Sequence, residues 1–545
     1  MTNLSSPSDS FESAKDLDLD SGAAGPVRLP VEVRRAYDVV AVSLLIVGAY
    51  IARRGALPGD GLWFDDSWVA TGAIYGHPQT LLTAGSGHPM FTALLMAINR
   101  VGTGSTTDLG VPSLVAGVIS PALLYAALRF TRFERSVSTI VAATLVVAPI
   151  PILYSGRVKG YTLDTVLMLG LAIVVPLMAK RRWTWPTAAA WALAMIVIGG
   201  FSGYLLLASA AATAVLVFHA NSDRWVRAGA LVAQGLVQVA YLRIAESKTD
   251  LAGIEAVMEA EYDGHMAFSL NPLSLAKQVF THLQRVAEVF PGGSGTVLSI
   301  AALAGVAGLV VAAIKPRTQP EALAARFLLL AMALAVTGSF ADRFPFGTTN
   351  DGLAIFSAGG RHTLWLLPAL AFGLASSASR GRQLLGRFDI ARFGLDVVLV
   401  LGAVSLVVTQ YQPAPKAPYQ GSRSASRFID ANIGPNDLLI VGSTATFTYA
   451  NNTNRPLRLV PTPTHQVGFA PDYRDKNVMG EGGWAARDVT DAEIVAAVKK
   501  ADRVFVIVDG VLNNTMQRVD PLLKPLGFSM QTHSFEWTRV DVWRR

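Results

Sequence analysis

The chain has 545 residues, of which 51% are hydrophobic and 16% charged, and its mean hydropathy is +0.40. This composition is too apolar for a soluble protein of this length and predicts a protein embedded in a lipid bilayer. The formal net charge is +7, but Lys and Arg gather in short segments between apolar runs, where they indicate membrane topology rather than nucleic-acid binding. The absence of cysteine excludes disulfides and thiolate metal or redox sites.

The first 35 residues are rich in Ser and Asp and carry no basic region ahead of an early apolar core. They match neither a signal peptide nor a transit peptide. Low hydrophobicity and several acidic side chains predict a disordered tail.

Apolar runs long enough to cross or nearly cross a bilayer follow, about eleven in all. The fifth and sixth are short and meet at a glycine-rich junction, so the count has an uncertainty of one. The predicted spans are 37–52, 111–128, 137–154, 161–179, 185–200, 201–219, 226–245, 296–314, 323–340, 357–376 and 394–411.

Basic clusters between these spans fall on one side of the membrane if the spans alternate, which predicts that this side is cytoplasmic. The N-terminus is then cytoplasmic and residues 412–545 are extracytoplasmic. Arg53 and Arg54 depart from the pattern, because they follow the first span on the outer side. Two interpretations remain open for them, interfacial anchoring and contact with a lipid phosphate. The agreeing clusters are Arg34/Arg35, Arg129/Arg132/Arg135, Lys180/Arg181/Arg182, Arg224/Arg227, Lys315/Arg317/Arg326 and Arg380/Arg382/Arg387/Arg392.

Two outer loops, 53–110 and 246–295, divide the predicted membrane domain, 36–411. Each contains a stretch that favours a helix lying on the membrane surface, Pro89–Val101 in the first and Leu275–Phe290 in the second.

Residues 412–545 differ in character, because their hydrophobic runs shorten to strand length. Leu438–Gly442 and Arg503–Val508 read as strands and Thr490–Ala501 as a helix, which predicts a small α/β domain. No phosphate loop, triad spacing or metal cluster stands out there. We therefore interpret it as a binding or scaffolding domain rather than a second catalytic one.

The first outer loop contains Asp65 and Asp66, flanked by Trp63 and Trp68. Adjacent carboxylates at a membrane surface are costly, which favours a functional role. Activation of an alcohol requires a carboxylate beside the acceptor hydroxyl. Asp65 and Asp66 are therefore the candidate catalytic residues. A solvated pair between aromatic anchors is the alternative, and a divalent cation held by both carboxylates also stays open, although a pair is an incomplete oxygen shell.

Transfer of a group from a lipid phosphate also requires positive charge near the departing phosphate. Basic residues at the predicted outer ends of the spans would supply that charge. Phosphate binding competes here with plain interfacial anchoring. The candidates for the donor phosphate are Arg157, Lys159, Arg361 and His362.

Three further residues are candidate acceptor or loop contacts: His88, Tyr161 and Trp68. His88 has an equal alternative as the cap of a helix that begins at Pro89.

The order of four outer motifs resembles the C-type glycosyltransferase (GT-C) superfamily, in particular the branch of the protein O-mannosyltransferases and lipid A aminoarabinose transferases. The resemblance covers most of residues 36–411. It depends on Asp65-Asp66, on Gly87-His-Pro leading into an apolar helix, on the segment from Tyr154 to Tyr161, and on Gly360-Arg-His before Pro368.

Three positions depart from that branch. Asp66 stands where the mannosyltransferases have Glu, Met90 stands where a second Pro follows the His-Pro pair, and Arg157-Val-Lys-Gly-Tyr161 replaces an Arg-Pro-Tyr segment. These departures leave the sugar and the acceptor open.

The resemblance implies a polytopic helical membrane enzyme of the plasma membrane with an outward-facing site. Its donor would be a polyprenyl-phosphate sugar, its acceptor a glycan, lipid or protein of the cell envelope, and its reaction inverting, with Asp65 as base or hydroxyl anchor. Two rival classes remain, a transporter or lipid flippase and a non-catalytic envelope scaffold. A transporter would be expected to carry mid-membrane charges and repeated halves, and neither is evident in the sequence.

Overall fold

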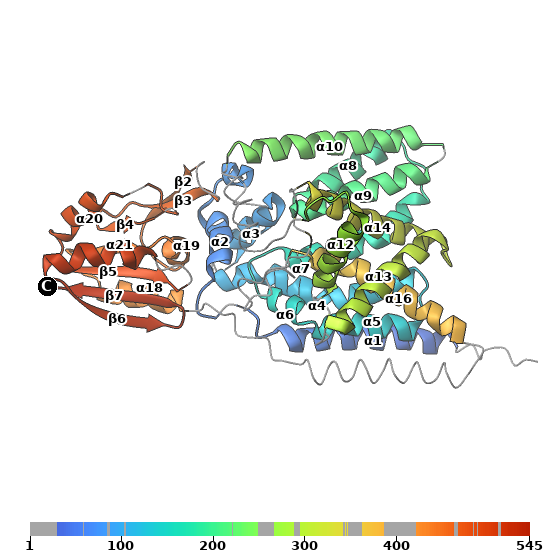
Figure 1. Ribbon diagram of the computed structural model, residues 1–545, viewed down its shortest axis with the longest axis horizontal. Helices are drawn as coiled ribbons and strands as arrows, with labels where there is room; N and C mark the ends of the chain where they lie inside the picture. The colour runs from blue at the N-terminus through green and yellow to red at the C-terminus, as the bar shows by residue number, and fades with distance from the viewer. Residues whose placement is uncertain are drawn as a thin grey trace, which may run out of the picture. The chain divides into compact units, whose positions relative to one another are not determined.

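The computed structural model describes residues 30–57, 59–83, 88–102, 105–220, 222–248, 266–287, 295–341, 344, 346, 362–385, 421–462, 467–482, 484–487, 489–510 and 514–545. In these ranges, helices occupy the part up to Leu385, and a mixed α/β domain follows from Ser422 (Figure 1). The predicted tail lies largely outside the described residues.

Helices correspond to every predicted span that the described residues cover. Five of the described helices are long and apolar enough to cross a bilayer: α1, α4, α7, α10 and α14. The helices are α1 (Val31–Arg53), α4 (Thr106–Phe130), α7 (Tyr161–Ala179), α8 (Trp185–Gly199), α9 (Gly203–His219), α10 (Arg224–Glu246), α13 (Gly295–Ile314), α14 (Gln319–Phe340) and α16 (Leu367–Leu385). The prediction of a polytopic helical membrane protein with a C-terminal α/β domain is confirmed, while 394–411 and the count of eleven lie beyond the described residues.

The predicted span 137–154 is wrong as a single element. The structure has two helices there, α5 (Arg135–Val147) and α6 (Pro149–Tyr154), with Ala148 in an extended conformation between them. Pro149 begins α6 and has no backbone N–H, and its ring disfavours a helical conformation in the residue before it. The break leaves carbonyls at the end of α5 without their intrahelical donors.

Arg53 fills that break, so both interpretations offered for it from the sequence are wrong. Its side chain is fully buried, and its Nη1 and Nη2 donate to the carbonyl oxygens of Val146 (3.0 Å) and Leu145 (2.6 Å). Its Nε donates to the hydroxyl of Ser155 at 3.1 Å. Arg53 therefore neither anchors at the interface nor meets a lipid phosphate, whereas Arg54 is exposed.

The predicted span 357–376 is not one continuous helix. Residues 362–366 form a turn and a short 3₁₀ helix, η4 (Leu364–Leu366), before α16 starts at Leu367. This places His362 before the helix rather than inside it.

The two long loops 53–110 and 246–295 contain the helices predicted near Pro89–Val101 and Leu275–Phe290, and the first loop contains two more. In the first loop lie α2 (Phe64–Tyr75), η1 (Pro78–Leu82) and α3 (Pro89–Val101), and in the second lies α12 (Pro272–Ala287). Helix α3 packs on α2 through Phe91 and Leu95, both fully buried. Packing of α2 on α3 fixes the helix that carries the acidic pair.

The C-terminal domain is built on a five-stranded sheet of order β4-β1-β5-β7-β6, in which β4, β1 and β5 are parallel and β7 and β6 antiparallel. A separate two-stranded ribbon joins β2 to β3. The strands are β1 (Leu438–Val441), β2 (Leu457–Thr462), β3 (Gly468–Tyr473), β4 (Val478–Gly480), β5 (Arg503–Asp509), β6 (Ser529–Phe535) and β7 (Thr538–Arg544).

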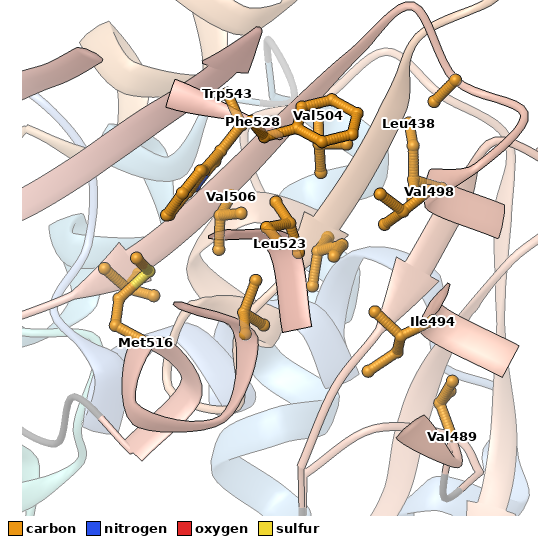
Figure 2. Packing of buried hydrophobic residues seen from close by; sticks show 14 residues of the cluster. Leu438, Val489, Ile494, Val498, Val504, Val506, Met516, Leu523, Phe528 and Trp543 are labelled. Carbon is orange, nitrogen blue, oxygen red and sulfur yellow. The ribbon is translucent and has the colours of Figure 1, made fainter. Parts of the chain in front are cut away.

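Alternate residues of the central strands supply two cores, one on each face of the sheet. Val504 and Val506 point to the face covered by α20 (Asp491–Val498) and α21 (Asn514–Leu523), where Figure 2 shows Val504 and Val506 near Leu523 and Phe528. Phe505 and its neighbours on the other face pack against α18 (Ser422–Asn432) and α19 (Ala445–Ala450). A strand places successive side chains on opposite faces, so β5 is buried on both sides.

The parallel strands β4, β1 and β5 end at one edge of this sheet. After β1 the chain continues to β4 at one edge of the sheet, whereas after β5 it continues to β6 and β7 at the opposite edge. The neighbouring strands β1 and β5 therefore flank a topological switch point. In open α/β sheets, this carboxyl edge is where ligands commonly bind. Helix α19 leaves from this edge and packs against α2 (Figure 1).

Candidate active site

The acidic pair stands in the first turn of α2. Trp63 occupies the N-cap position, and Asp65 and Asp66 follow where the positive end of the helix dipole favours negative side chains. Asp66 is 2% exposed, whereas Asp65 is partly exposed. The helix therefore turns one carboxylate inward and leaves the other accessible.

Asp66 pairs with Arg157, which is also 2% exposed. Arg157 Nε donates to Asp66 Oδ2 at 2.5 Å, and its guanidinium carbon lies 4.5 Å from the centroid of the Trp63 ring. Within the described ranges, Nη1 and Nη2 of Arg157 and Oδ1 of Asp66 are buried without a hydrogen-bond partner. Burial lowers the pKa of Arg157, but the charge of Asp66 and its hydrogen bond raise it, and the net shift is upward. Arg157 is therefore a buried cation beside Asp66 with two hydrogen-bond donors unused.

The loop between α6 and α7 holds Arg157 through its backbone. At Gly156 a Cβ would lie 1.7 Å from the carbonyl oxygen of Ala56, so only glycine allows this approach. Further along, the hydroxyl of Ser113 donates to the Lys159 carbonyl (2.7 Å), and Thr162 donates to the Ser113 carbonyl (2.9 Å). The loop is therefore fixed at both ends.

The second cation of the site, Lys159, lies against the ring of Trp68, which belongs to an aromatic cluster. Lys159 Nζ lies 4.5 Å from the ring centroid of Trp68, and Lys159 is only 7% exposed. Trp68 stacks on Trp484 with 5.8 Å between centroids and 17° between planes, and Phe64 meets both rings edge-on. Trp484 follows β4, so the C-terminal domain contributes a ring to this wall.

The C-terminal domain also holds α2 by hydrogen bonds. Asn451 Nδ2 donates to the Ser67 carbonyl (2.8 Å), and the Thr71 hydroxyl pairs with Asn451 Oδ1 (3.0 Å). Tyr75 donates to the Ala450 carbonyl at 3.1 Å. These bonds run along one side of α2 over about two turns and fix its orientation.

A second group forms around His362. The hydroxyl of Tyr204 lies 3.1 Å from His362 Nδ1, and the ring of Tyr161 meets the imidazole edge-on at 6.0 Å. Tyr161 in turn contacts Tyr154, whose ring lies 5.8 Å from the Arg157 guanidinium. A chain of aromatic contacts thus connects His362 to the Arg157 centre.

The structure therefore brings together most of the predicted site residues. Asp66, Arg157, Lys159 and Trp68 gather at α2, while Arg361 lies outside the described residues. His88 stands at the N-cap of α3, but its side chain makes no capping hydrogen bond, so the capping alternative fails. Among the described residues, no group of three or more His, Asp or Glu side chains is arranged to hold a metal.

Sequence reasoning missed several residues of this site. Trp484, Asn451 and Tyr204 lie more than 130 positions from Asp66 in the chain, and no local pattern connects them to it. Trp484 does have one signal, because it is a bulky aromatic inside the glycine-rich run Gly480-Glu-Gly-Gly-Trp484.

Solved structures with a similar fold are found by comparison. The chain is similar to ArnT from Cupriavidus metallidurans in its apo state, with a TM-score of 0.53 and 13% identity over 94% of this chain and 98% of that one. The ArnT structure bound to undecaprenyl phosphate gives a TM-score of 0.52 at the same identity and coverage. An oligosaccharyltransferase from Archaeoglobus fulgidus gives 0.45 at 12% identity, over 91% of this chain and 72% of that one. No protein-family model and no curated protein matches the chain.

The fold and the helix arrangement define the class: this is a helical membrane protein with the fold of the GT-C glycosyltransferases. The predicted resemblance is confirmed at the level of fold. The similarity extends over nearly the whole chain, so it includes the C-terminal α/β domain.

Proposed function

We propose that the chain is a membrane glycosyltransferase that moves a sugar from a polyprenyl-phosphate donor to a hydroxyl of a cell-envelope acceptor, on the outer face of the plasma membrane. The observation that carries the proposal is the buried Asp66–Arg157 pair with two unused guanidinium nitrogens. A buried cation whose donors have no protein partner is costly unless a ligand supplies the acceptors.

The pair divides its hydrogen bonds in a way that suits a phosphate. Asp66 accepts from Nε, which leaves the planar Nη1 and Nη2 fork for two oxygens of one phosphate group. Asp66 is then a positioning residue that orients Arg157. Lys159 and His362 add charge and hydrogen-bonding capacity at the same end of α7, and Arg361 remains a prediction from the sequence.

Asp65 keeps the role of base or hydroxyl anchor. In the transfer, the acceptor oxygen bonds to the anomeric carbon, the bond from that carbon to the phosphate oxygen breaks, and the hydroxyl proton passes to the carboxylate of Asp65. The phosphate leaves as an anion that Arg157 stabilises. Attack opposite to the leaving phosphate makes the reaction inverting.

The fold supports the donor class. One ArnT structure of the same fold holds undecaprenyl phosphate, a polyprenyl phosphate. The sequence motifs resemble the branch that contains the lipid A aminoarabinose transferases.

Transfer activity tests the proposal directly. The purified protein in lipid nanodiscs would receive a panel of synthetic polyprenyl-phosphate pentoses and hexoses together with an envelope extract as acceptor source. The proposal expects sugar incorporation that Asp65→Asn abolishes. Intact donor moved between leaflets without transfer would instead support a flippase, and neither activity would support a scaffold.

Topology provides a second test. We propose a cytoplasmic N-terminus and an extracytoplasmic domain from residue 412, because the basic clusters agree on one side. Reporter fusions at residues 30 and 545 should report opposite sides of the membrane. Cytoplasmic signals from both would remove the outward-facing site.

Metal dependence is tested separately. If Asp65 and Asp66 shared a divalent cation, chelation would reproduce the loss caused by Asp65→Asn. The roles given above require no such ion, and we expect activity to survive chelation.

A further inference from the structure

A polar hollow of about 570 Å³ lies where the C-terminal domain meets the start of α4. Its volume is within the range of roughly 300–1,000 Å³ that is usual for ligand sites. Helix α18 supplies Arg427 and Asp430, the segment after α19 supplies Asn452 and Asn454, and Ser105 closes the side toward the membrane helices.

The chemistry of the lining indicates a hydroxyl-rich ligand. Every described lining residue except Ala431 is polar: the Asn amides donate to and accept from hydroxyls, the guanidinium groups donate, and the carboxylate accepts. Among the described residues, the lining offers no apolar wall for a lipid tail and no aromatic ring on which a nucleobase could stack. The described lining carries two arginines and one aspartate: Arg423 is engaged with the Gly59 carbonyl and the Thr106 hydroxyl, and the charges of Arg427 and Asp430 oppose each other, so no cluster of like charge selects an ionic ligand. A neutral sugar chain satisfies these conditions.

The hollow is fixed to the helix of the acidic pair. Asn451, one of its lining residues, accepts from Thr71 and donates to the Ser67 carbonyl, one residue after Asp66. On the other side, Arg423 donates to the hydroxyl of Thr106 at 2.7 Å and so joins α18 to α4. The lining is therefore held by hydrogen bonds to both the C-terminal domain and the membrane helices.

The close approach of the start of α18 to the segment before α2 requires a glycine at position 61. Gly61 has a φ of +103°, and a Cβ there would lie 2.1 Å from the hydroxyl oxygen of Ser422. Glycine adopts this left-handed conformation without strain and leaves room for the start of α18. The backbone N–H of Gly421 also donates to the Asp60 carbonyl at 2.8 Å.

We propose that this hollow binds a glycan segment of the acceptor, at a subsite separate from the reacting hydroxyl. The inference rests on the proposed glycosyltransferase function and names its acceptor class: a neutral oligosaccharide rather than a lipid or a protein. Sugar rings in the hollow would tether the acceptor beside α2, which raises the local concentration of its reacting end at Asp65.

Direct binding tests the proposal without turnover. The full chain in nanodiscs would be titrated with end-labelled mannan, arabinan and glucan hexasaccharides and, separately, with undecaprenyl phosphate. Two kinds of variant address the hollow. Ala431→Trp fills it from an exposed helix position, and Arg427→Ala with Asn454→Ala removes polar groups at exposed positions. Asn436→Ala, an exposed residue of the same domain outside the hollow, is the matched control.

We expect at least one hexasaccharide to bind the parent chain and to lose at least ~10-fold in affinity in Ala431→Trp and in the double variant. Asn436→Ala should bind it like the parent, and undecaprenyl phosphate affinity should be unchanged in every variant. The proposal is overturned if no hexasaccharide binds, if filling the hollow leaves binding intact, or if a Ser/Thr-rich peptide binds there instead. If the parent chain did not bind undecaprenyl phosphate, that result would contradict the proposed function itself.

Discussion

Two buried arginine–aspartate pairs of this chain have the same composition but differ in how many hydrogen bonds the arginine donates. Arg227 pairs with Asp223 at 3.1 Å and lies 5.0 Å from the ring of Trp183, much as Arg157 pairs with Asp66 beside Trp63.

The difference lies in the terminal nitrogens. Arg227 Nη1 donates to the Leu216 carbonyl, and Nη2 donates to the Arg181 carbonyl and to Asp223. Both terminal nitrogens of Arg157 lack a partner in the described part of the chain. Burial and charge are therefore alike in the two arginines, and the unused hydrogen-bonding capacity of Nη1 and Nη2 distinguishes Arg157 as the proposed phosphate-binding residue.

The largest expected effect concerns Asp65. Asp65→Asn keeps the size of the side chain and most of its hydrogen bonding, but it removes the proposed general base, and loss of a general base typically costs ~10²–10⁴ in rate. We expect sugar transfer to fall by that factor while undecaprenyl phosphate still binds. Single-turnover assays alongside lipid titration measure the two quantities, and transfer at the parent rate would remove Asp65 from the chemistry.

The second prediction compares the two arginines. Arg157→Lys keeps the charge against Asp66 but removes the planar fork, and hydrogen bonds to charged groups contribute about 1.5–3 kcal/mol. We expect undecaprenyl phosphate affinity to fall by about 10- to 100-fold. Microscale thermophoresis in nanodiscs measures it.

Arg227→Lys is the matched control. It should leave phosphate-lipid affinity unchanged and lower thermal stability, because the carbonyls of Leu216 and Arg181 lose their donors. Equal losses of affinity in the two variants would contradict a special role for Arg157.

The third prediction concerns the aromatic wall. Trp484→Ala removes the stack on Trp68, and aromatic pairs contribute about 0.5–1.5 kcal/mol beyond their buried area. We expect transfer to fall about 3- to 10-fold, because Trp68 and Lys159 lose their support. Trp537→Ala, in the turn between β6 and β7, is the control and should transfer sugar like the parent. An unchanged rate in Trp484→Ala would confine the C-terminal domain to scaffolding.

The smallest effect on turnover comes from a buried carboxylate with full hydrogen bonding. Asp509 accepts from the hydroxyls of Thr448 and Thr538, and burial raises its pKa to about 6. Because the folded pKa lies above the ordinary value, its stabilising contribution is present below pH ~4 and is lost as the pH rises through 6. The difference is on the order of 3 kcal/mol.

Thermal unfolding between pH 4 and pH 7.5 checks this prediction. The parent should lose stability across that window, and Asp509→Asn should lose less while transferring sugar normally. A pH profile that is identical in both proteins would show that Asp509 does not titrate in the folded domain.

The sequence predicts most of the described membrane helices, the helix Pro89–Val101 and the two central strands β1 and β5 well, because apolar periodicity and length determine them locally. It fails at 137–154, where a continuous apolar run conceals the break before Pro149. It also misassigns Arg53, because the carbonyls that this side chain binds are exposed only by that break.

The candidate site divides in the same way. Asp65, Asp66 and Arg157 are visible from residue type and predicted topology, since carboxylates and cations at outer span ends are rare and costly. The choice between the two aspartates, with Asp66 buried against Arg157 and Asp65 partly exposed, depends on how α2 is rotated. That rotation is fixed by Asn451 and Trp484, whose contacts cross some 380 to 420 positions of the chain and leave no local trace in the sequence.

A density map of the protein with bound undecaprenyl phosphate tests the central claim most directly. The account predicts the phosphate within about 3 Å of Nη1 and Nη2 of Arg157, with Asp66 still accepting from Nε and Asp65 facing the space beyond the phosphate. A phosphate bound elsewhere, with both terminal nitrogens of Arg157 satisfied by protein groups as in Arg227, would contradict it.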